Sequence, residues 1–309
     1  MGVILEKRGL EWEYADCRME DREKVLACLK SSGATHVICA AGVTGRPNVD
    51  WCEANQVATI RSNVIGTLTL VDCCELLNIH VLNFTTGCIF HYDEAHPLNI
   101  ERDPKTLVAR DLEKTFTEVE KANFHGSFYS RTKAYCEDML RSYKCVCSLR
   151  LRMPIDSDLS NPRNFIHKIA NYNKIVNIPN SMTMLDELLP FAVELSLRKR
   201  TGIYNFCNPG AISHNQVMEL YKMYIDPEKT WSNFSVEEQA KVIVAPRSNN
   251  ELCPTKLWKE FPEMLPIRES IIKYVCKPNQ TELSKTAFAN GRFREGSYSE
   301  DKLREGWTL

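Results

Sequence analysis

Residues 36–42, His-Val-Ile-Cys-Ala-Ala-Gly, form a short apolar run closed by a glycine, which predicts a buried strand followed by a tight turn. Residues 21–30, before this run, carry apolar side chains at helical spacing, and residues 53–77, after it, have the period of a long helix. The same alternation continues with a strand at 80–86, a helix at 128–143 and a strand at 145–151. It predicts an α/β fold, a doubly wound parallel sheet covered by helices.

The second half of the chain continues this pattern. Helices are predicted to begin at residues 161–164, to span 185–197, and to run from an N-cap at Ser213 to about 224, with a strand at 202–206. The division that we expect is a larger α/β domain at 1–154, a smaller C-terminal α/β subdomain at 155–278, interleaved with the sheet, and a mobile polar tail at 279–309.

The long predicted helix carries one apolar stripe, which we expect to face the sheet: Val57, Ile60, Val64, Leu68 and Val71. Asn63 lies inside the same helix, although asparagine is a poor helix former. We therefore predict that the Asn63 side chain hydrogen-bonds to backbone outside the helix.

Composition and charge exclude several classes of function. Lys plus Arg total 39 and Asp plus Glu total 40, so the net charge of -1 gives no electrostatic reason to expect nucleic acid or an anionic membrane as partner. No apolar run approaches the roughly 18 residues that span a bilayer. The 13 cysteines form no CxxC pair or Cys/His cluster, which indicates reduced thiols in a cytoplasmic protein and no metal site.

Tyr129 and Lys133 lie four residues apart on the predicted helix, so the phenol and the ammonium share one face. A lysine beside a tyrosine favours the phenolate, and we expect it to lower the pKa of Tyr129 and make it a proton donor or acceptor. The pair alone is common on solvated helices. Its place between two strands, one ending in Thr86, favours the Ser/Thr-Tyr-Lys site of short-chain dehydrogenases.

Cys88 follows the same strand end, where ligands of parallel sheets bind, and its thiol could exchange a proton there. The other cysteines are expected to be small buried hydrophobes. Lys168 has no distinguishing context and could equally be a solvated helix lysine. The small residues Ala40, Ala41 and Gly42 would let a cofactor approach the backbone closely, although they also suit a tight loop.

Longer motifs carry a family resemblance: residues 41–52, 86–90, 126–133, 152–154, 161–165, 178–182, 185–190 and 242–252. Together they resemble the bifunctional nucleotide-rhamnose synthases, the 3,5-epimerase/4-reductases of the extended short-chain dehydrogenases. The resemblance runs from about residue 9 to 278. It implies a Rossmann-like fold, here N-terminally incomplete, with an NADP-binding domain at 1–154 and a substrate-binding subdomain at 155–278. The implied activity converts UDP- or dTDP-4-keto-6-deoxyglucose to the L-rhamnose nucleotide with NADPH, or with NADH as the alternative.

The resemblance also implies residue roles. Cys88 and Lys168 would act as acid and base at C3 and C5, in an order that the sequence leaves open. Tyr129 would protonate the C4 oxygen, Thr86 would hydrogen-bond it, and Lys133 would hold the cofactor ribose. The remaining residues implied at the cofactor are Arg18, Cys39, Ala40, Ala41, Gly42, Asn63, Arg152, Met153 and Pro154.

The resemblance leaves other questions open. A homodimer and a functional partnership with a nucleotide-glucose 4,6-dehydratase are both compatible with it. Reduction or epimerisation alone remains an alternative, as does a non-catalytic or truncated relative that serves as a binding or regulatory protein. The segment between Phe90 and Tyr129 is roughly a dozen residues longer than in plant members. Within it, we expect residues 93–123 to be a solvated surface loop with one helix, which tolerates shortening.

The family opens with a strand and a GxxGxxG loop over the cofactor pyrophosphate, and these residues have no counterpart in the sequence. From this we expect the 309-residue chain to fold marginally and to bind NADPH poorly. Adding a family-like segment of about 20 to 25 residues should restore both properties. NADPH affinity and the thermal midpoint of the two chains would test the expectation, and micromolar binding by the shorter chain with no gain on extension would contradict it.

Overall fold

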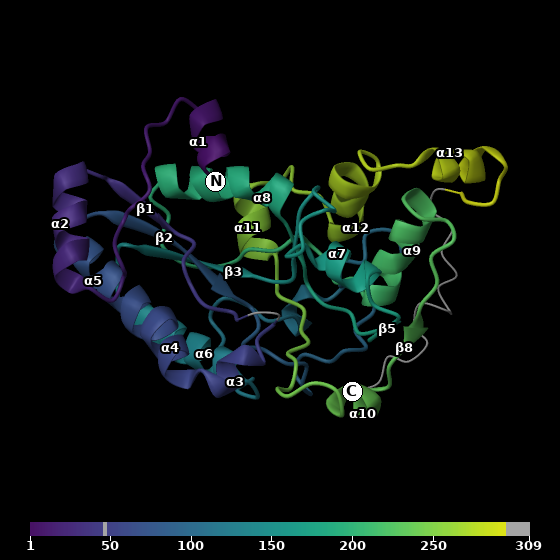
Figure 1. Ribbon diagram of the computed structural model, residues 1–309, viewed down its shortest axis with the longest axis horizontal. Helices are drawn as coiled ribbons and strands as arrows, with labels where there is room; N and C mark the ends of the chain where they lie inside the picture. Colours follow the sequence, from purple (N-terminus) through teal and green to yellow (C-terminus); the bar gives the residue numbers. More distant parts are fainter. Residues whose placement is uncertain (46–47, 295–309) are drawn as a thin grey trace.

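The computed structural model describes residues 1–45 and 48–294, and a four-stranded parallel sheet lies at its centre (Figure 1). The strand order is β1-β2-β3-β7, with bounds β1 His36–Cys39, β2 His80–Thr86, β3 Val146–Leu151 and β7 Gly202–Asn205. In register, His36 lies opposite His80, and Thr86 lies opposite Leu151. The predicted α/β fold with a parallel sheet is confirmed.

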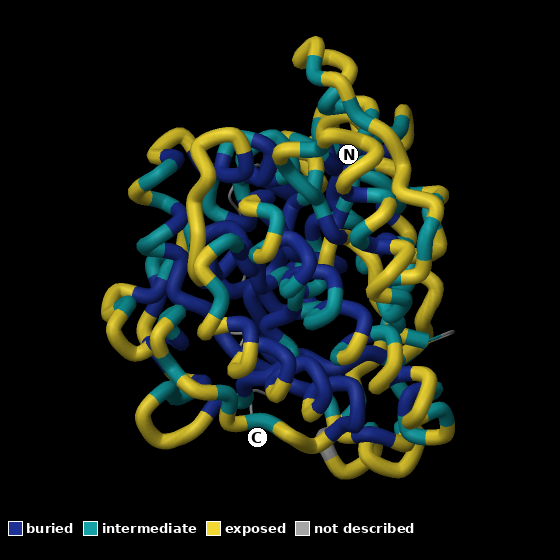
Figure 2. Tube along the Cα trace, turned by 90° about the vertical axis from the view of Figure 1, so that its left-hand side faces the viewer, coloured by how far each residue is buried: buried dark blue, intermediate teal, exposed yellow. Residues whose placement is uncertain are grey.

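Helices cover both faces of this sheet (Figure 1). One layer contains α2 Arg22–Ser32, α3 Trp51–Ala54, α4 Gln56–Ile60, the π-helical turn η1 Arg61–Gly66, α5 Thr67–Leu76 and α6 Phe128–Leu140. The other contains α1 Gly2–Lys7, α8 Leu185–Leu197 and α11 Thr255–Glu260. Val81 packs into the core of the first layer and its neighbour Leu82 into that of the second, because alternate side chains leave a strand on opposite faces. The buried chain accordingly runs through the middle of the molecule (Figure 2).

The rest of the chain builds a second core beside the sheet. Its helical elements are α7 Phe165–Ala170, α9 His214–Tyr224, α10 Val236–Ala240, α12 Ile267–Ile271, the π-helical turn η3 Ile272–Cys276 and α13 Glu282–Ala289. Two short sheets pair β4 Pro154–Ile155 with β6 Thr183–Met184, and β5 Lys174–Ile175 with β8 Ser232–Asn233. The structure confirms the predicted helix at 185–197 and the N-cap at Ser213, which forms a capping box with Gln216. It places the start of α7 at Phe165, after an Asn164 cap, instead of at 161–164.

The long helix predicted at 53–77 is divided into α3, α4, η1 and α5, and the predicted stripe is only partly buried. Val57 and Ile60 are 67% and 38% exposed, whereas Thr59 and Asn63 are fully buried. A π-helical turn contains more residues than the 3.6 of a regular α-helical turn. The side chains before and after it therefore do not lie on one continuous stripe.

The segment 93–123 is not the solvated loop that the sequence predicts. Its only helical element among the described residues is the 3₁₀ turn η2 Leu112–Lys114, and it buries Leu98, Ile100 and Phe116. Phe116 pairs with the strand-like segment around Leu252: its N–H donates to Glu251 O (2.9 Å) and its carbonyl accepts from Cys253 N (2.8 Å). The segment is therefore part of the core, and its backbone is hydrogen-bonded.

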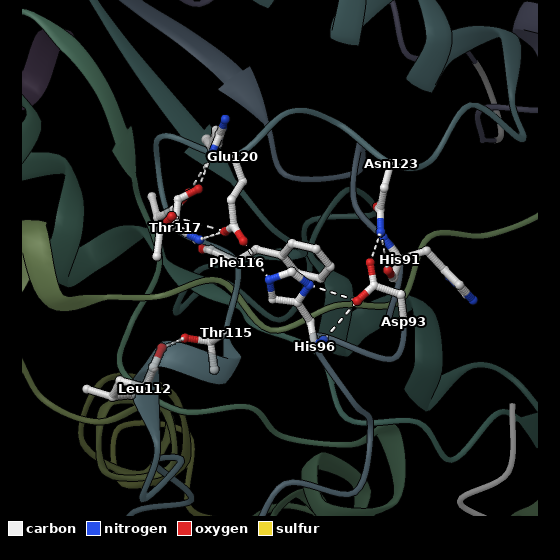
Figure 3. A network of polar contacts seen from close by, with 11 residues as sticks. His91, Asp93, His96, Leu112, Thr115, Phe116, Thr117, Glu120 and Asn123 are labelled. Carbon is white, nitrogen blue, oxygen red and sulfur yellow. Dashed lines mark hydrogen bonds and ion pairs between the residues drawn. The ribbon is translucent and has the colours of Figure 1, made fainter.

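A network of polar contacts centred on His96 joins distant parts of the 93–123 segment (Figure 3). The ring of His96 stacks on Phe116 with centroids 3.9 Å apart. Its Nδ1 lies 2.8 Å from Asp93 Oδ1, and its Nε2 lies 2.5 Å from Glu120 Oε1. Asn123 joins the two ends of the segment by donating to the carboxylate of Asp93 (2.7 Å).

A buried ion pair joins α6 to the sheet. Arg150 in β3 donates from Nε and Nη2 to the two carboxylate oxygens of Glu137 in α6, at 2.9 and 2.6 Å. Its Nη1 donates to Thr117 O (3.0 Å) and Asn205 Oδ1 (3.2 Å), so one side chain links α6, β7 and the 93–123 segment.

The C-terminal segment differs from the predicted mobile tail. Helix α13 packs on α9, with Ser284 Oγ donating to Met223 O (2.7 Å) and the Phe288 ring 5.2 Å from that of Tyr224. The polar composition of this segment did not predict a packed helix at 282–289. Residues 295–309, the end of that predicted tail, lie outside the described residues.

We predict that Phe116→Ala destabilises the protein by about 3–5 kcal/mol, because it removes a buried ring that stacks on both Phe90 and His96. Chemical denaturation would measure the free energy of unfolding. Val119→Ala is the matched control, since Val119 belongs to the same segment and is 82% exposed. Equal, small effects of the two substitutions would mean that the segment is a solvated loop after all.

Candidate active site at the carboxyl ends of the strands

Helix α6 presents Tyr129 and Lys133 toward the sheet, where they are 7% and 8% exposed. The start of the helix is fixed by its N-cap Ser127, whose hydroxyl accepts from Ser130 N at 3.0 Å. Glu53 of α3 accepts a further hydrogen bond from Phe128 N at 2.6 Å. Spacing of four residues and a capped first turn therefore place both side chains on the buried face.

Tyr129 meets the end of β2. Its phenol shares a hydrogen bond with Thr86, and Thr86 Oγ1 also accepts from Cys88 N at 3.0 Å. Burial, and then the sulfur of Cys88, raise the pKa of Tyr129 above its usual value, while the bond to Thr86 acts in the opposite direction. We predicted a lowered pKa for Tyr129; in this structure its pKa is raised instead, and burial is the largest cause. The phenol keeps its proton and can donate it.

Lys133 lies beside the loop that follows β1. A Cβ added to Gly42 would be 3.2 Å from Asn63 Oδ1 and 3.5 Å from Lys133 Nζ, so the glycine leaves room for both groups. Burial lowers the pKa of Lys133. Cys39 is buried at the end of β1, whereas the backbone of Ala40, Ala41 and Gly42 beyond it is exposed.

Asn63 fixes this loop. Its Oδ1 accepts from Val43 N at 2.7 Å, and its Nδ2 donates to Val43 O at 2.8 Å, so the amide satisfies both backbone polar groups of Val43. The predicted bond from Asn63 to backbone outside its helix is confirmed. Asn63 lies in the π-helical turn η1, where the helix tolerates a residue that bonds elsewhere.

These residues fit a nicotinamide dinucleotide. An exposed loop of small residues allows close approach, and the described residues leave the Lys133 ammonium without an ion-pair partner, as a donor for ribose hydroxyls would require. Met153 and Pro154 follow the end of β3, where Met153 adopts a φ of 37° and Pro154 begins β4. Arg18, also predicted at the cofactor, is 77% exposed in its side chain and bonds Glu20 at 3.2 Å, so the structure does not bring it to this group.

Lys168 belongs to α7, which packs against β4, the strand that begins at Pro154. Burial, and then the charge of Arg163, lower the pKa of Lys168 below its usual value. Its ammonium makes no hydrogen bond or ion pair with any residue that the structure describes. Lys168 therefore lies on α7, and no hydrogen bond or ion pair between the described residues joins it to Cys88.

Sequence reasoning missed the amides that hold the Cys88 loop. Asn250 Nδ2 donates to Gly87 O and to Phe90 O, each at 2.9 Å, and Ser248 Oγ also donates to Phe90 O at 2.6 Å. Asn180 bonds Arg152, which in turn contacts Cys88. The signal was available: each of these three polar residues lies within a motif that carried the resemblance, but none has a charge to suggest a role.

All thirteen cysteines are free, and Cys88 is half-buried. Across residues 1–45 and 48–294, no cluster of His, Cys, Asp or Glu has the composition of a metal site. The helices in the same ranges are all too short or too polar to cross a membrane.

The model of the NAD dependent epimerase/dehydratase family matches residues 5–153. A bifunctional dTDP-4-dehydrorhamnose 3,5-epimerase/dTDP-4-dehydrorhamnose reductase of Arabidopsis thaliana is 55% identical over 280 residues, 91% of this chain and 89% of that protein. The chain therefore belongs to the epimerase/dehydratase family, in its rhamnose-nucleotide epimerase/reductase branch. The expected resemblance is confirmed.

Two further relatives agree with this assignment. The Arabidopsis trifunctional UDP-glucose 4,6-dehydratase/UDP-4-keto-6-deoxy-D-glucose 3,5-epimerase/UDP-4-keto-L-rhamnose-reductase RHM3 is 56% identical over 91% of this chain, which spans only 40% of its length. The crystal structure of a UDP-rhamnose synthase from Acanthamoeba polyphaga mimivirus superposes with a TM-score of 0.80 at 35% identity, covering 87% of this chain and 93% of that one.

We predict that Asn63→Ala weakens both folding and cofactor binding, because it leaves the N–H and C=O of Val43 without their partner. The loss of a buried amide that makes two bonds should cost about 2–4 kcal/mol in the free energy of unfolding. Urea denaturation and NADPH titration would measure the two effects. Asn55→Ala is the control, since Asn55 bonds only within its own helical segment (Trp51 O, 2.8 Å). Unchanged NADPH affinity in folded Asn63→Ala would separate this loop from the cofactor.

Proposed function

We propose that the chain converts UDP- or dTDP-4-keto-6-deoxy-D-glucose to the L-rhamnose nucleotide by 3,5-epimerisation and NADPH-dependent reduction of the 4-keto group. The observation that carries the proposal is the group formed by Thr86, Cys88 and Tyr129 at the end of β2, one helical turn from Lys133. It combines a thiol for proton transfer with a phenol that retains its proton. Relatives of more than half identity are named for these two activities.

Epimerisation requires proton exchange at C3 and C5. Both protons are α to the C4 ketone, so removing either gives an enolate whose charge lies on the C4 oxygen. Cys88 and Lys168 are the two groups proposed to remove and return these protons on opposite faces of the sugar. The lowered pKa of Lys168 suits this role, because a lysine with a lowered pKa exchanges its proton closer to neutral pH.

Reduction uses the same oxygen. When bound, the nicotinamide cofactor supplies the hydride for C4. The phenol of Tyr129 donates its proton to the C4 oxygen as negative charge develops there, and the hydroxyl of Thr86, already bonded to the phenol, orients the transfer. Lys133, with Gly42 and Asn63, would hold the cofactor ribose and the neighbouring backbone.

The 4-keto-6-deoxy substrate must come from a nucleotide-glucose 4,6-dehydratase. The trifunctional relatives are named for that activity as well, and the chain matches 40% of their length. We therefore propose a functional partnership with such a dehydratase. The names of the relatives include both UDP and dTDP sugars, so both nucleotides belong in the assay.

We predict that two substitutions separate the two reactions. Cys88→Ala should stop solvent deuterium from entering at C3 and C5 while NADPH binding survives, because the thiol serves only proton transfer. Tyr129→Phe should block formation of the rhamnose nucleotide but leave part of the deuterium exchange. Mass spectrometry of recovered sugar nucleotide in D₂O, with and without NADPH, measures both.

Cys28→Ala is the matched control, because Cys28 is a half-buried thiol of α2, away from the site, and its loss should change neither reaction. Exchange at wild-type rate in Cys88→Ala would exclude the proposed epimerase role. Exchange without any reduction in the wild-type chain would limit the activity to epimerisation.

A further inference from the structure

Arg152 is a buried cation without a carboxylate beside it. The residue is 2% exposed, and none of the described residues places a carboxylate oxygen within ion-pair distance of its guanidinium. Two other buried arginines each bond a buried glutamate, in the pairs Arg102–Glu251 and Arg150–Glu137. Because an unpaired buried charge is costly, the surroundings of Arg152 need another group that can bear negative charge.

The sulfur of Cys88 is such a group. It lies 2.8 Å from Arg152 Nη1, which donates to it. The second terminal nitrogen, Nη2, donates to Ser248 O at 3.0 Å and to Asn180 Oδ1, and both of these residues are buried. The two oxygen acceptors hold the guanidinium so that its other arm points at the sulfur.

The backbone at Gly87 is shaped for this contact. A Cβ added to Gly87 would lie 2.9 Å from Arg152 Cγ and 2.6 Å from Leu252 Cδ1. The stem of Arg152 therefore crosses directly over Gly87 to reach the next residue, Cys88. Asn250 holds the same turn through its bond to Gly87 O (2.9 Å), so the sulfur and the guanidinium are positioned from both sides.

We propose that Arg152 is a positioning residue for epimerisation, which stabilises Cys88 in its thiolate form and fixes the sulfur at the end of β2. The inference rests on the proposed function for the substrate, but the Arg152–Cys88 pair itself is geometric. A charge-assisted hydrogen bond and a buried positive charge both favour the anionic sulfur, which is the form that accepts a proton. This role differs from the cofactor contact that the sequence resemblance implies for Arg152.

Proton transfer at C3 or C5 needs no reagent other than Cys88, Lys168 and solvent. The thiolate sulfur forms an S–H bond with the proton at C3 or C5. The C–H electron pair becomes the C=C bond to C4, and the carbonyl π pair moves to the C4 oxygen. A proton from the Lys168 ammonium adds to the opposite face of the same carbon, which restores the ketone and leaves a neutral amine. Exchange with solvent then returns thiol and amine to their starting forms.

The other titratable groups that face this pair are neutral near pH 7. Tyr129 faces Cys88 from α6, and its pKa is raised by burial. His91, Tyr92 and His214 surround Arg152. Burial, and then the charge of Arg152, lower the pKa of His91 and, to about 4, that of His214. Among the groups named here, Arg152 is therefore the one that carries a charge, and its Nη1 lies 2.8 Å from the sulfur.

The wild-type chain provides the first test, read by alkylation with iodoacetamide and peptide mass spectrometry. Because only the thiolate reacts, the labelling rate of Cys88 should change less than about twofold between pH 7 and pH 9. Cys17 is the internal reference: it is half-buried, and burial and then its neighbour Cys28 raise its pKa, so its rate should rise throughout this range. A Cys88 rate that rises in parallel with that of Cys17 would overturn the proposal.

Substitutions provide the second test. Arg152→Met should slow Cys88 labelling at pH 7 by about tenfold or more, and solvent-deuterium exchange should fall with it and recover as the pH is raised. Arg152→Lys keeps the positive charge but loses the planar guanidinium and its several N–H donors. It should lower the labelling and exchange rates less than Arg152→Met does. Arg198→Met, which removes the exposed arginine that follows α8, is the matched control and should change neither rate.

The readouts separate this inference from the proposed function. Unchanged Cys88 labelling in folded Arg152→Met, with a raised Kd for NADPH, would assign Arg152 to the cofactor and overturn the inference. Slower Cys88 labelling in Arg152→Met supports it even when no 4-keto-6-deoxyglucose nucleotide is turned over, in which case only the proposed substrate fails.

Discussion

The rest of the structure depends on the buried ion pair between Arg150 and Glu137. It bonds the helix that carries Tyr129 and Lys133 to the central strand β3, and the third arm of the same guanidinium reaches the 93–123 segment at Thr117. Both partners are almost fully buried, so removing either one would leave an uncompensated charge, which typically costs about 3–5 kcal/mol. This bidentate contact joins α6 directly to the sheet below the site.

Neutral side-chain amides hold the loops around the site by hydrogen bonds. Asn63 bonds both polar groups of Val43, Asn250 bonds the turn at Gly87, and Asn180 bonds Arg152. Loops beyond the ends of parallel strands have no ladder to satisfy their backbone, and a buried side-chain amide supplies both a donor and an acceptor. The site is thus held rigid without placing carboxylates next to the thiol of Cys88.

Much of the fold was predictable because it depends on local patterns. The four strands of the main sheet, the cap of α9 at Ser213 and the full extent of α8 follow from apolar period and capping residues. The bond of Asn63 was also predictable, since an asparagine inside a helix needs a local reason. The exposure of Val57 was not predictable, because the spacing of apolar residues does not reveal the π-helical turn that interrupts the stripe. The burial of Phe116 was not predictable either, because its charged neighbours give the segment the composition of a solvated loop.

By itself, the sequence determined the α/β class, the family, and the place of Thr86, Cys88, Tyr129 and Lys133 in the chain. Residue spacing and long motifs can be read directly from the linear sequence. Only the tertiary structure decided the state of these groups. Burial, which depends on segments far apart in sequence, raises the pKa of Tyr129 where the neighbouring Lys133 alone suggested the opposite. The contact of Arg152 with Cys88 joins residues 64 positions apart, and it arises because their strands are neighbours in the parallel sheet.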